Sequence, residues 1–368
     1  MSTNMKAIRF ERSTDFAKEL NKRIKNYFKE NNISRYGNKT LYWKTVFMFS
    51  LYAVPYILLV SGIIHANWFL FLVYTLMGIG FAGIGFSVMH DANHGAYSKN
   101  QKVNKWLGAS LNVLGGYDLC WKVQHNVLHH TFTNIHGLDE DIETAPIVRL
   151  NPYAPKKKIH KYQHLYIPFL YGLMTFVWIF IKDFSQMFRY KKLGLFKPYN
   201  INWGWEFTKM VLWKTFYLFY TIFVPWYFLG YDLWAVLLAF FVMHFVGSEL
   251  LAWVFQLAHV VEDAEIYDPK KTSKYDDKFA HQLKTTTNFH LPAFMSWFVG
   301  GLNHQVEHHL FPNISHVHYK DIMPIVKQTA EEYGVPYYYF PSFYEGAKSH
   351  LMLLKKLGND DVKIRVKE

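Results

Sequence analysis

Long uncharged stretches dominate the first quarter of the chain. Residues 45–64 and 68–88 contain no Asp, Glu, Lys or Arg. Each run has about 20 residues, enough to cross about 30 Å of hydrocarbon as an α-helix. Only His65, Ala66 and Asn67 separate the two runs. The pattern therefore predicts a tight hairpin of two transmembrane helices.

Further apolar blocks follow at 165–181, 207–229 and 233–259. The last two blocks are joined only by residues 230–232, so we expect a second hairpin. The block at 165–181 is near the lower length limit for a spanning helix and is followed by basic residues. We therefore expect residues 165–181 to dip into the cytoplasmic leaflet or to lie along it.

The expected fold is an all-α integral membrane protein with four transmembrane helices in two hairpins and a cytoplasmic, histidine-rich di-metal domain. Four spans leave both termini and the active site on one side, and the basic N-terminal segment predicts that this side is cytoplasmic. The expected divisions are a cytoplasmic N-terminal segment (1–44), hairpin 1 (45–88), a cytoplasmic and interfacial region (89–206), hairpin 2 (207–259) and a cytoplasmic C-terminal region (260–368).

Composition supports a membrane protein and disfavours other classes. The chain is 51% hydrophobic and 19% aromatic but only 18% charged, which excludes a disordered protein. Its net charge is +12, and the Lys and Arg residues flank the apolar blocks, as at cytoplasmic membrane margins. We therefore expect membrane lipid, and no nucleic acid, as a partner. The single cysteine, Cys120, excludes a Cys-rich metal site, whereas the 19 histidines are unusual.

Histidines gather in three clusters outside the predicted spans. The first pair has i, i+4 spacing, which places both imidazoles on one helical face. The second cluster repeats that spacing and adds an adjacent histidine, an arrangement that suits two metal ions better than one. The third has Gln, His and His at i, i+3 and i+4. These clusters are His90 and His94; His125, His129 and His130; and Gln305, His308 and His309, with His304 as an alternative ligand in the third.

Two more histidines lie in the last predicted span. His259 is at its cytoplasmic end, where a satisfied helix-end histidine and a metal ligand are equally good interpretations. His244 lies about four turns deeper. There we expect a neutral hydrogen bond between helices rather than a functional site, although an ionisable residue at that depth raises the functional hypothesis.

The three clusters resemble the histidine boxes of the membrane fatty acid desaturase superfamily, which follow HxxxH, HxxHH or HxxxHH, and H/QxxHH. The segment from Gly300 to Pro312 contains the third box, and Gln305 at its first position resembles the front-end branch (delta-5, delta-6 or linoleoyl-CoA desaturase-like). Front-end enzymes insert a double bond between an existing one and the carboxyl end. Many eukaryotic members carry a fused cytochrome b5 domain, which residues 1–44 do not resemble.

The resemblance implies a membrane fatty acyl desaturase with two iron ions. His259 occupies the place of the family's histidine after the last span, so the expected ligands are the boxed residues and His259. Such an imidazole-rich site suits Fe, Zn, Cu or Ni, but zinc has no redox role, and removing hydrogens from an alkyl chain requires O2 and electrons. The candidates that would orient the imidazoles from behind are Asp91, Asn93, Asp139, Asp141, Glu143, Glu262 and Glu307.

The expected partners are a fatty acyl-CoA or acyl-lipid substrate, O2 and a separate electron donor of the ferredoxin or cytochrome b5 type. The chain has no haem motif, dinucleotide fingerprint or cysteine set for an iron-sulfur cluster. Basic residues such as Lys156, Lys157, Lys158, Lys182 and Lys191 are candidates for docking an acidic donor. A lipid hydroxylase with the same boxes is one alternative, and a membrane metal transporter or a di-haem electron carrier is another of a different class.

Overall fold

The computed structural model describes residues 8–143, 146–272 and 274–361. The chain divides into two compact units. We call residues 39–123 and 169–252 the span unit, and residues 1–38, 124–168 and 253–368 the histidine unit. Both are mainly helical, as the sequence predicts.

The span unit contains the long apolar helices. Where α3 (Asn67–Ile84) crosses α2 (Lys39–Val60), a Cβ atom on Gly80 would lie 2.7 Å from the backbone nitrogen of Tyr52. Only a glycine permits this close approach, which is typical of helices that pack inside membranes. The elements are α2 (Lys39–Val60), α3 (Asn67–Ile84), η2 (Gly85–Met89), α4 (His90–Asn93), α5 (Gln101–Gly108), α6 (Ser110–Val113), α7 (Asp118–Lys122), α9 (Met174–Val177), η5 (Trp178–Lys182), α10 (Asp183–Leu193), η6 (Lys197–Tyr199), α11 (Trp203–Leu218), η7 (Phe219–Phe228) and α12 (Leu233–His259), which continues into the histidine unit.

Three helices of the described chain are long and apolar enough to cross a membrane: Lys39–Val60, Asn67–Asn93 and Leu233–His259. They coincide with three of the four predicted spans. The fourth predicted span, 207–229, is helical as α11 and η7 but is not among these three. It contains Lys209 and Lys214, and Lys214 is buried in an ion pair with Asp183 at 2.8 Å.

The block that we expect to lie along the membrane is also helical but broken. Lys158–Tyr171 and Met174–Leu193 together are long and apolar enough for one span, but they are bent by 74° at the break. A bend of this size is compatible with a broken span or a re-entrant loop. The described chain therefore has three or four candidate spans.

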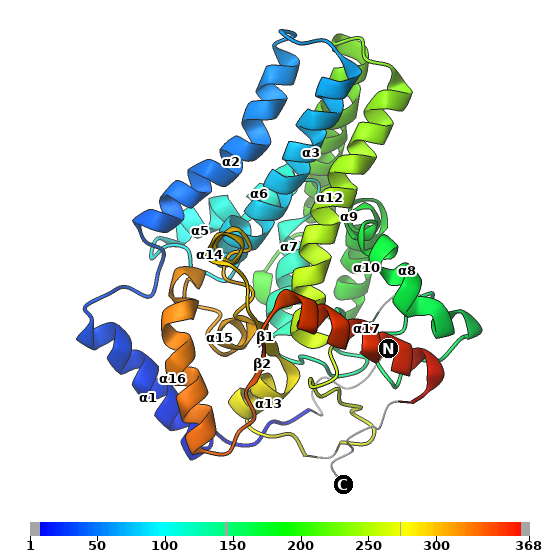
Figure 1. The fold of residues 1–368 in the computed structure, drawn as a ribbon. Helices are drawn as coiled ribbons and strands as arrows, with labels where there is room; N and C mark the ends of the chain where they lie inside the picture. Colours follow the sequence, from blue (N-terminus) through cyan, green and yellow to red (C-terminus); the bar gives the residue numbers. More distant parts are fainter. Residues whose placement is uncertain (1–7, 144–145, 273, 362–368) are drawn as a thin grey trace. The chain divides into compact units, whose positions relative to one another are not determined.

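A hydrophobic core of the histidine unit forms where α1 (Asp15–Glu30) and α16 (Tyr319–Glu332) pack together with residues of neighbouring elements. Thr14 caps α1 by accepting a hydrogen bond from the Ala17 amide, and Phe16, Leu20 and Ile24 recur at helical spacing on its buried face. Figure 1 shows α1 beside α16. Residues 1–44, expected as a cytoplasmic lead-in segment, thus contain an amphipathic helix that the sequence pattern does not predict.

The third histidine box packs on the same core. Val306 and Leu310, four residues apart on α15 (Gln305–Leu310), are buried in it and anchor one face of the short helix. The elements of the unit are α1 (Asp15–Glu30), η3 (Val123–His129), η4 (Lys158–Tyr162), α8 (Gln163–Tyr171), α13 (Lys278–Thr285), β1 (Thr287–Phe289), α14 (Ala293–Phe298), α15 (Gln305–Leu310), η8 (His316–His318), α16 (Tyr319–Glu332), β2 (Tyr338–Phe340) and α17 (Phe343–Asn359). Strands β1 and β2 pair in parallel.

Candidate metal centre

The second histidine box adopts a π-helical turn instead of the expected α-helix. In η3 the amide of His130 donates to the carbonyl of His125, five residues earlier, at 3.0 Å. This wider turn brings residues five apart onto the same side, and such π-turns are frequent at functional sites. The rings of His125 and His130 therefore lie 4.8 Å apart, and that of His129 lies 5.2 Å from His125. All three side chains are buried.

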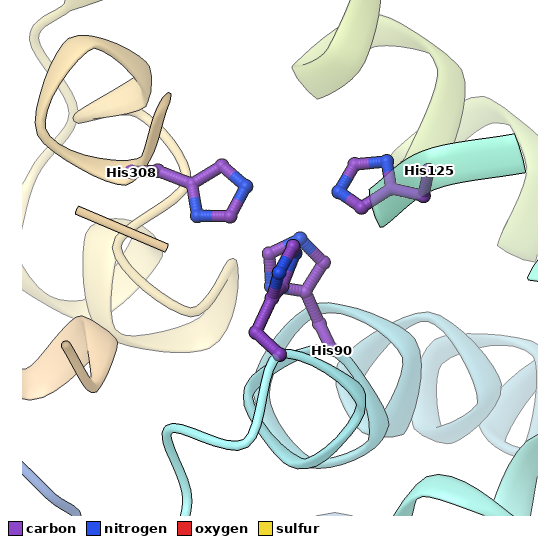
Figure 2. Close-up of side chains that lie close together, drawn as sticks. His90, His125 and His308 are labelled. Atoms are coloured by element: carbon purple, nitrogen blue, oxygen red, sulfur yellow. The ribbon is translucent and has the colours of Figure 1, made fainter. Parts of the chain in front are cut away.

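The second and third boxes meet in the histidine unit through their Nε2 atoms. His130 Nε2 lies 3.3 Å from His125 Nε2 and 2.9 Å from His308 Nε2. His129 Nε2 lies 3.3 Å from His309 Nε2. Figure 2 shows the rings of His125 and His308 with their nitrogen edges turned toward each other. The clustering predicted for these five histidines is thus found in the structure.

His259, at the end of α12, joins this cluster. Its ring lies 4.7 Å from that of His129 and 4.6 Å from that of His309. One nitrogen from each of these three histidines lies within 4.8 Å of the other two. His130, His308 and His309 form a second such group. Because His309 belongs to both, the two groups are adjacent, an arrangement that suits two metal ions.

Hydrogen bonds at Nδ1 fix the tautomers of three of these histidines. His259 Nδ1 lies 3.1 Å from the Thr285 carbonyl oxygen, which can only accept. His129 Nδ1 lies 3.1 Å from both carboxylate oxygens of Asp139. His309 Nδ1 lies 2.8 Å from Gln282 Oε1. With its proton on Nδ1, each ring presents the lone pair of Nε2 to the centre.

Two supporting contacts make this assignment consistent. Gln282 Nε2 donates to the His130 carbonyl oxygen at 3.1 Å, which leaves Gln282 Oε1 as the acceptor for His309. The Asp139 carboxylate is fully buried and also accepts the backbone amides of Asn134 and Asp141. Backbone donors of this kind hold the carboxylate in place behind His129.

The facing lone pairs provide a test of whether a metal ion fits. His129 Nε2 and His309 Nε2 are 3.3 Å apart, yet in these tautomers neither has a proton to donate, so they repel each other. His259 Nε2 is buried and has no hydrogen-bond partner among the described residues. A cation about 2.1 Å from each nitrogen would remove the repulsion, since this is the length of a metal–imidazole bond. The donor set therefore fits a transition metal.

The third box is held by a polar network on the other side of α15. Asn288 Nδ2 donates to Glu307 Oε2 at 2.7 Å, and the Tyr337 hydroxyl donates to Glu307 Oε1 at 2.9 Å. Burial raises the pKa of Glu307 to about 7. Asn288 Oδ1 also accepts the Val306 amide. Glu307 thus braces the helix through β1 and Tyr337, while His308 Nδ1 lies 3.0 Å from the Tyr319 hydroxyl.

The candidate orienting residues occupy different environments. Asp139 contacts His129 directly, and Asp141 lies 3.3 Å from the same Nδ1 atom while accepting from Gln124. Glu143 pairs instead with His136, and Glu262 pairs with Lys356. Sequence reasoning missed Gln282, Thr285 and Tyr319. A backbone carbonyl such as that of Thr285 leaves no residue-type signal, and neither Gln282 nor Tyr319 belongs to a recognisable spacing.

Gln305 and His304, at the start of the third box, each have a buried side-chain nitrogen without a hydrogen-bond partner among the described residues. Gln305 is 1% exposed, and its Nε2 atom has no hydrogen-bond partner among the described residues. His304 precedes α15 and belongs to none of the groups of described residues whose geometry could hold a metal ion. Burial lowers the pKa of His304 to about 4, with smaller contributions from the charges of Lys320 and His290.

The first box lies in the span unit. His90 and His94 flank the single turn α4, directly after the π-helical η2, and their rings are 4.7 Å apart. Trp121 contacts both rings edge-on at 5.7 and 5.8 Å. Figure 2 shows His90 on its helix. Asp91 and Asn93 are buried on the same turn, so the expected i, i+4 pair is present.

Comparison with known proteins matches residues 66–341 to the family described as fatty acid desaturase. The chain belongs to the fatty acid desaturase family. It is 33% identical to the sn-1 linoleoyl-lipid 6-desaturase of Arthrospira platensis, over 97% of this chain and 96% of that protein. The sn-1 linoleoyl-lipid 6-desaturase of Synechocystis sp. is also 33% identical, over 95% of this chain and 98% of the relative.

A third relative of the desaturase is longer. The acyl-lipid (8-3)-desaturase of Physcomitrium patens is 34% identical over 94% of this chain and 72% of its own length. Family membership confirms the resemblance drawn from the histidine boxes and identifies the chain as an O2-dependent fatty acyl desaturase, an oxidoreductase of lipid metabolism.

Proposed function

We propose that this desaturase inserts a front-end double bond into an acyl chain carried on a membrane lipid. Two relatives that match nearly the whole chain are named as linoleoyl-lipid 6-desaturases. Gln305 in the third box supports the same regiochemistry. The observation that carries the proposal is the convergence of the buried Nε2 atoms of His129, His259 and His309, each with an acceptor at Nδ1.

We further propose that the boxed residues and His259 hold two iron ions. The nine ligands would be His90, His94, His125, His129, His130, His259, Gln305, His308 and His309. When bound, iron would supply the redox chemistry of the reaction. Overall, O2 takes two hydrogen atoms from adjacent methylenes, together with two electrons and two protons, and is reduced to two water molecules. The residues behind the ligands, such as Asp139, Gln282 and the Thr285 carbonyl, keep the proton on Nδ1.

A separate protein of the ferredoxin or cytochrome b5 type is the proposed source of electrons. Electrostatic docking requires accessible cations. Lys157 and Lys158 are exposed, whereas Lys156 is paired with Asp360 at 2.9 Å and Lys191 lies 3.8 Å above the ring of Trp203. Among the basic candidates, Lys157 and Lys158 are therefore the better docking residues for an acidic donor.

The proposed topology has four spans in two hairpins, with the termini and the metal centre in the cytoplasm. It assigns residues 45–88 and 207–259 to the membrane and the remaining segments to the cytoplasmic side. The bent helices between Lys158 and Leu193 then enter one leaflet without crossing. Labelling of single cysteines from either side of sealed vesicles tests this arrangement.

Expression in a host of defined fatty acid composition tests the function most directly. Mass spectrometry of the separated lipid classes should locate a new double bond between an existing one and the carboxyl end, first in intact lipids. A product that appears first in acyl-CoA would contradict the lipid-linked substrate. A hydroxylated chain without a new double bond would overturn desaturation in favour of the hydroxylase alternative.

A further inference from the structure

A long uncharged segment of the histidine unit reaches the protein surface. Residues 285–306 contain no Asp, Glu, Lys or Arg. Within this segment, the short helix α14 leaves Phe294 65% exposed and Met295 38% exposed, and the preceding Pro292 is also exposed. Exposed apolar side chains in a run without charges are poorly suited to contact with water alone.

A second apolar segment emerges at the same edge. Strands β1 and β2 pair in parallel and end together at Phe289 and Phe340. Beyond them, the chain leads into α14 on one side and α17 on the other. The His290 amide still donates to the Phe340 carbonyl at 2.9 Å. The two segments are thus held together where they leave the strands.

The side chains exposed here form what we call the aromatic patch: Phe294, Met295, Tyr339, Phe343 and Tyr344. Tyr344 is the most exposed, at 73%. The hydroxyl of Tyr339, in β2, lies 3.4 Å from Nδ1 of His290, the residue directly after β1. Phe343 packs near Phe289, with ring centroids 6.2 Å apart. The five side chains of the patch are uncharged, and the exposed Glu345 follows Tyr344 at its margin.

The patch continues from a candidate membrane span. Phe343 contacts Trp253, with ring centroids 6.1 Å apart, and Trp253 lies on α12, one of the three helices long enough to cross a membrane. Aromatic side chains gather at the level of the lipid headgroups. Lys348, one turn further along α17, is exposed and suits the anionic headgroups found there.

Another surface of the same unit has the opposite character. Helix α16 exposes the charged residues Lys320, Asp321, Lys327, Glu331 and Glu332. Its last turn is followed by Tyr333, which is 44% exposed, close to the exposure of Tyr339 in the patch. A single aromatic side chain among charges is ordinary for a surface in water.

We propose that the aromatic patch lies in the interfacial layer of the lipid bilayer. The C-terminal region is then a part of the protein that enters the membrane surface without crossing it, rather than a wholly cytoplasmic segment. Because Asn288 of β1 bonds to Glu307 of α15, the patch also anchors the third histidine box near the membrane surface. The proposal rests on the patch alone and does not depend on the regiochemistry or the metal.

Fluorescent labelling at single cysteines tests this contact. The only native cysteine, Cys120, is fully buried, so a surface cysteine becomes the main site for an environment-sensitive fluorophore. Phe294→Cys and Tyr344→Cys probe the patch, with Met295→Cys as a second variant on α14, and Tyr333→Cys is the matched control. The full-length, iron-loaded protein is placed in nanodiscs of phosphatidylcholine and phosphatidylglycerol with plain or brominated acyl chains, and unlabelled wild type provides the blank.

We expect brominated lipid to reduce the fluorescence of labels at positions 294 and 344, and aqueous iodide to leave it unchanged. The label at position 333 should respond in the opposite way. Quenching of all three labels by iodide alone would overturn the proposal. Labels at 294 and 344 that neither quencher reaches would also overturn it, because that result means that protein, such as a second copy of this chain, covers the patch.

Discussion

His244 and His259 lie on the same helix, α12, yet their ring nitrogens have different surroundings. Both nitrogens of His244 are used within the span unit: Nδ1 lies 2.8 Å from the Thr175 hydroxyl and Nε2 lies 2.6 Å from the Tyr217 hydroxyl. His259 uses Nδ1 alone, and its buried Nε2 has no hydrogen-bond partner among the described residues. The first histidine is satisfied by protein groups, whereas the second has a lone pair for a metal.

Burial alone does not identify a metal ligand. Both side chains are buried, at 1% and 4% exposure. What separates them is the partner of the second nitrogen, which depends on side chains from other helices. The expectation that His244 makes a hydrogen bond between helices is confirmed, because Thr175 belongs to α9 and Tyr217 to α11.

Alanine substitutions of the two α12 histidines should have the largest and most divergent effects on bound iron. His259→Ala should abolish turnover and lower the bound iron, because it removes a proposed ligand. His244→Ala should keep the iron but lower the thermal midpoint, because leaving a buried hydroxyl unpaired costs about 1–3 kcal/mol. Metal analysis and thermal unfolding of both purified variants check this. Equal iron loss in both would show that the hydrogen bonds do not distinguish the two roles.

The buried carboxylate behind His129 should have the next largest effect. Asp139→Asn weakens the acceptor at Nδ1 and should reduce iron affinity or turnover by about 10–100-fold. Glu262→Gln is the control, since Glu262 pairs with Lys356 on the surface. Iron titration of the two variants measures the difference. If Asp139→Asn binds iron like wild type, the carboxylate does not set the tautomer.

Substitutions at the start of the third box sharpen the ligand assignment. We expect Gln305→Ala to reduce turnover severely and Gln305→His to alter or reduce it, because an amide is a weaker donor than imidazole. His304→Ala should retain activity, since His304 is outside the metal-binding groups of the described residues. If Gln305→Ala has normal turnover and His304→Ala is inactive, the ligand at the start of the third box is His304 rather than Gln305. The main support for front-end chemistry would then be lost.

A third kind of buried histidine should have a smaller, pH-dependent effect. His350 of α17 bonds through Nδ1 to the Val260 carbonyl at 2.6 Å, and burial lowers its pKa to about 4. In the unfolded chain the pKa of this imidazole is about 6.5. Between about pH 4 and 6.5 the unfolded state therefore binds a proton that the folded state excludes. The contribution of His350 to the free energy of unfolding is therefore fully present above about pH 6.5. It falls by up to about 3 kcal/mol as the pH decreases through about 4.

Thermal unfolding of wild type and His350→Gln across this pH range measures the contribution. The variant should have a lower midpoint near pH 7 and a shallower decline toward pH 4. If the thermal midpoints of the two proteins fall equally as the pH is lowered, groups other than His350 account for the acid sensitivity.

Sequence patterns predicted the helices and much of the histidine cluster, because apolar runs and box spacing are local signals. They did not predict the π-helical turn that brings His130 close to His125, since i→i+5 bonding has no residue signature here. Nor did they reveal Gln282 or the Thr285 carbonyl, which reach the ligands only through tertiary packing. Helix α1 was missed because its alternating charges conceal the buried stripe of Phe16, Leu20 and Ile24.

Metal analysis of the active, purified wild-type protein, combined with an optical spectrum, is the decisive test of a two-iron centre held by the histidine boxes and His259. We predict two irons per chain and no Soret band, because the converging imidazoles would hold iron directly, without haem. Stoichiometric zinc in active enzyme, or a haem spectrum, would contradict it.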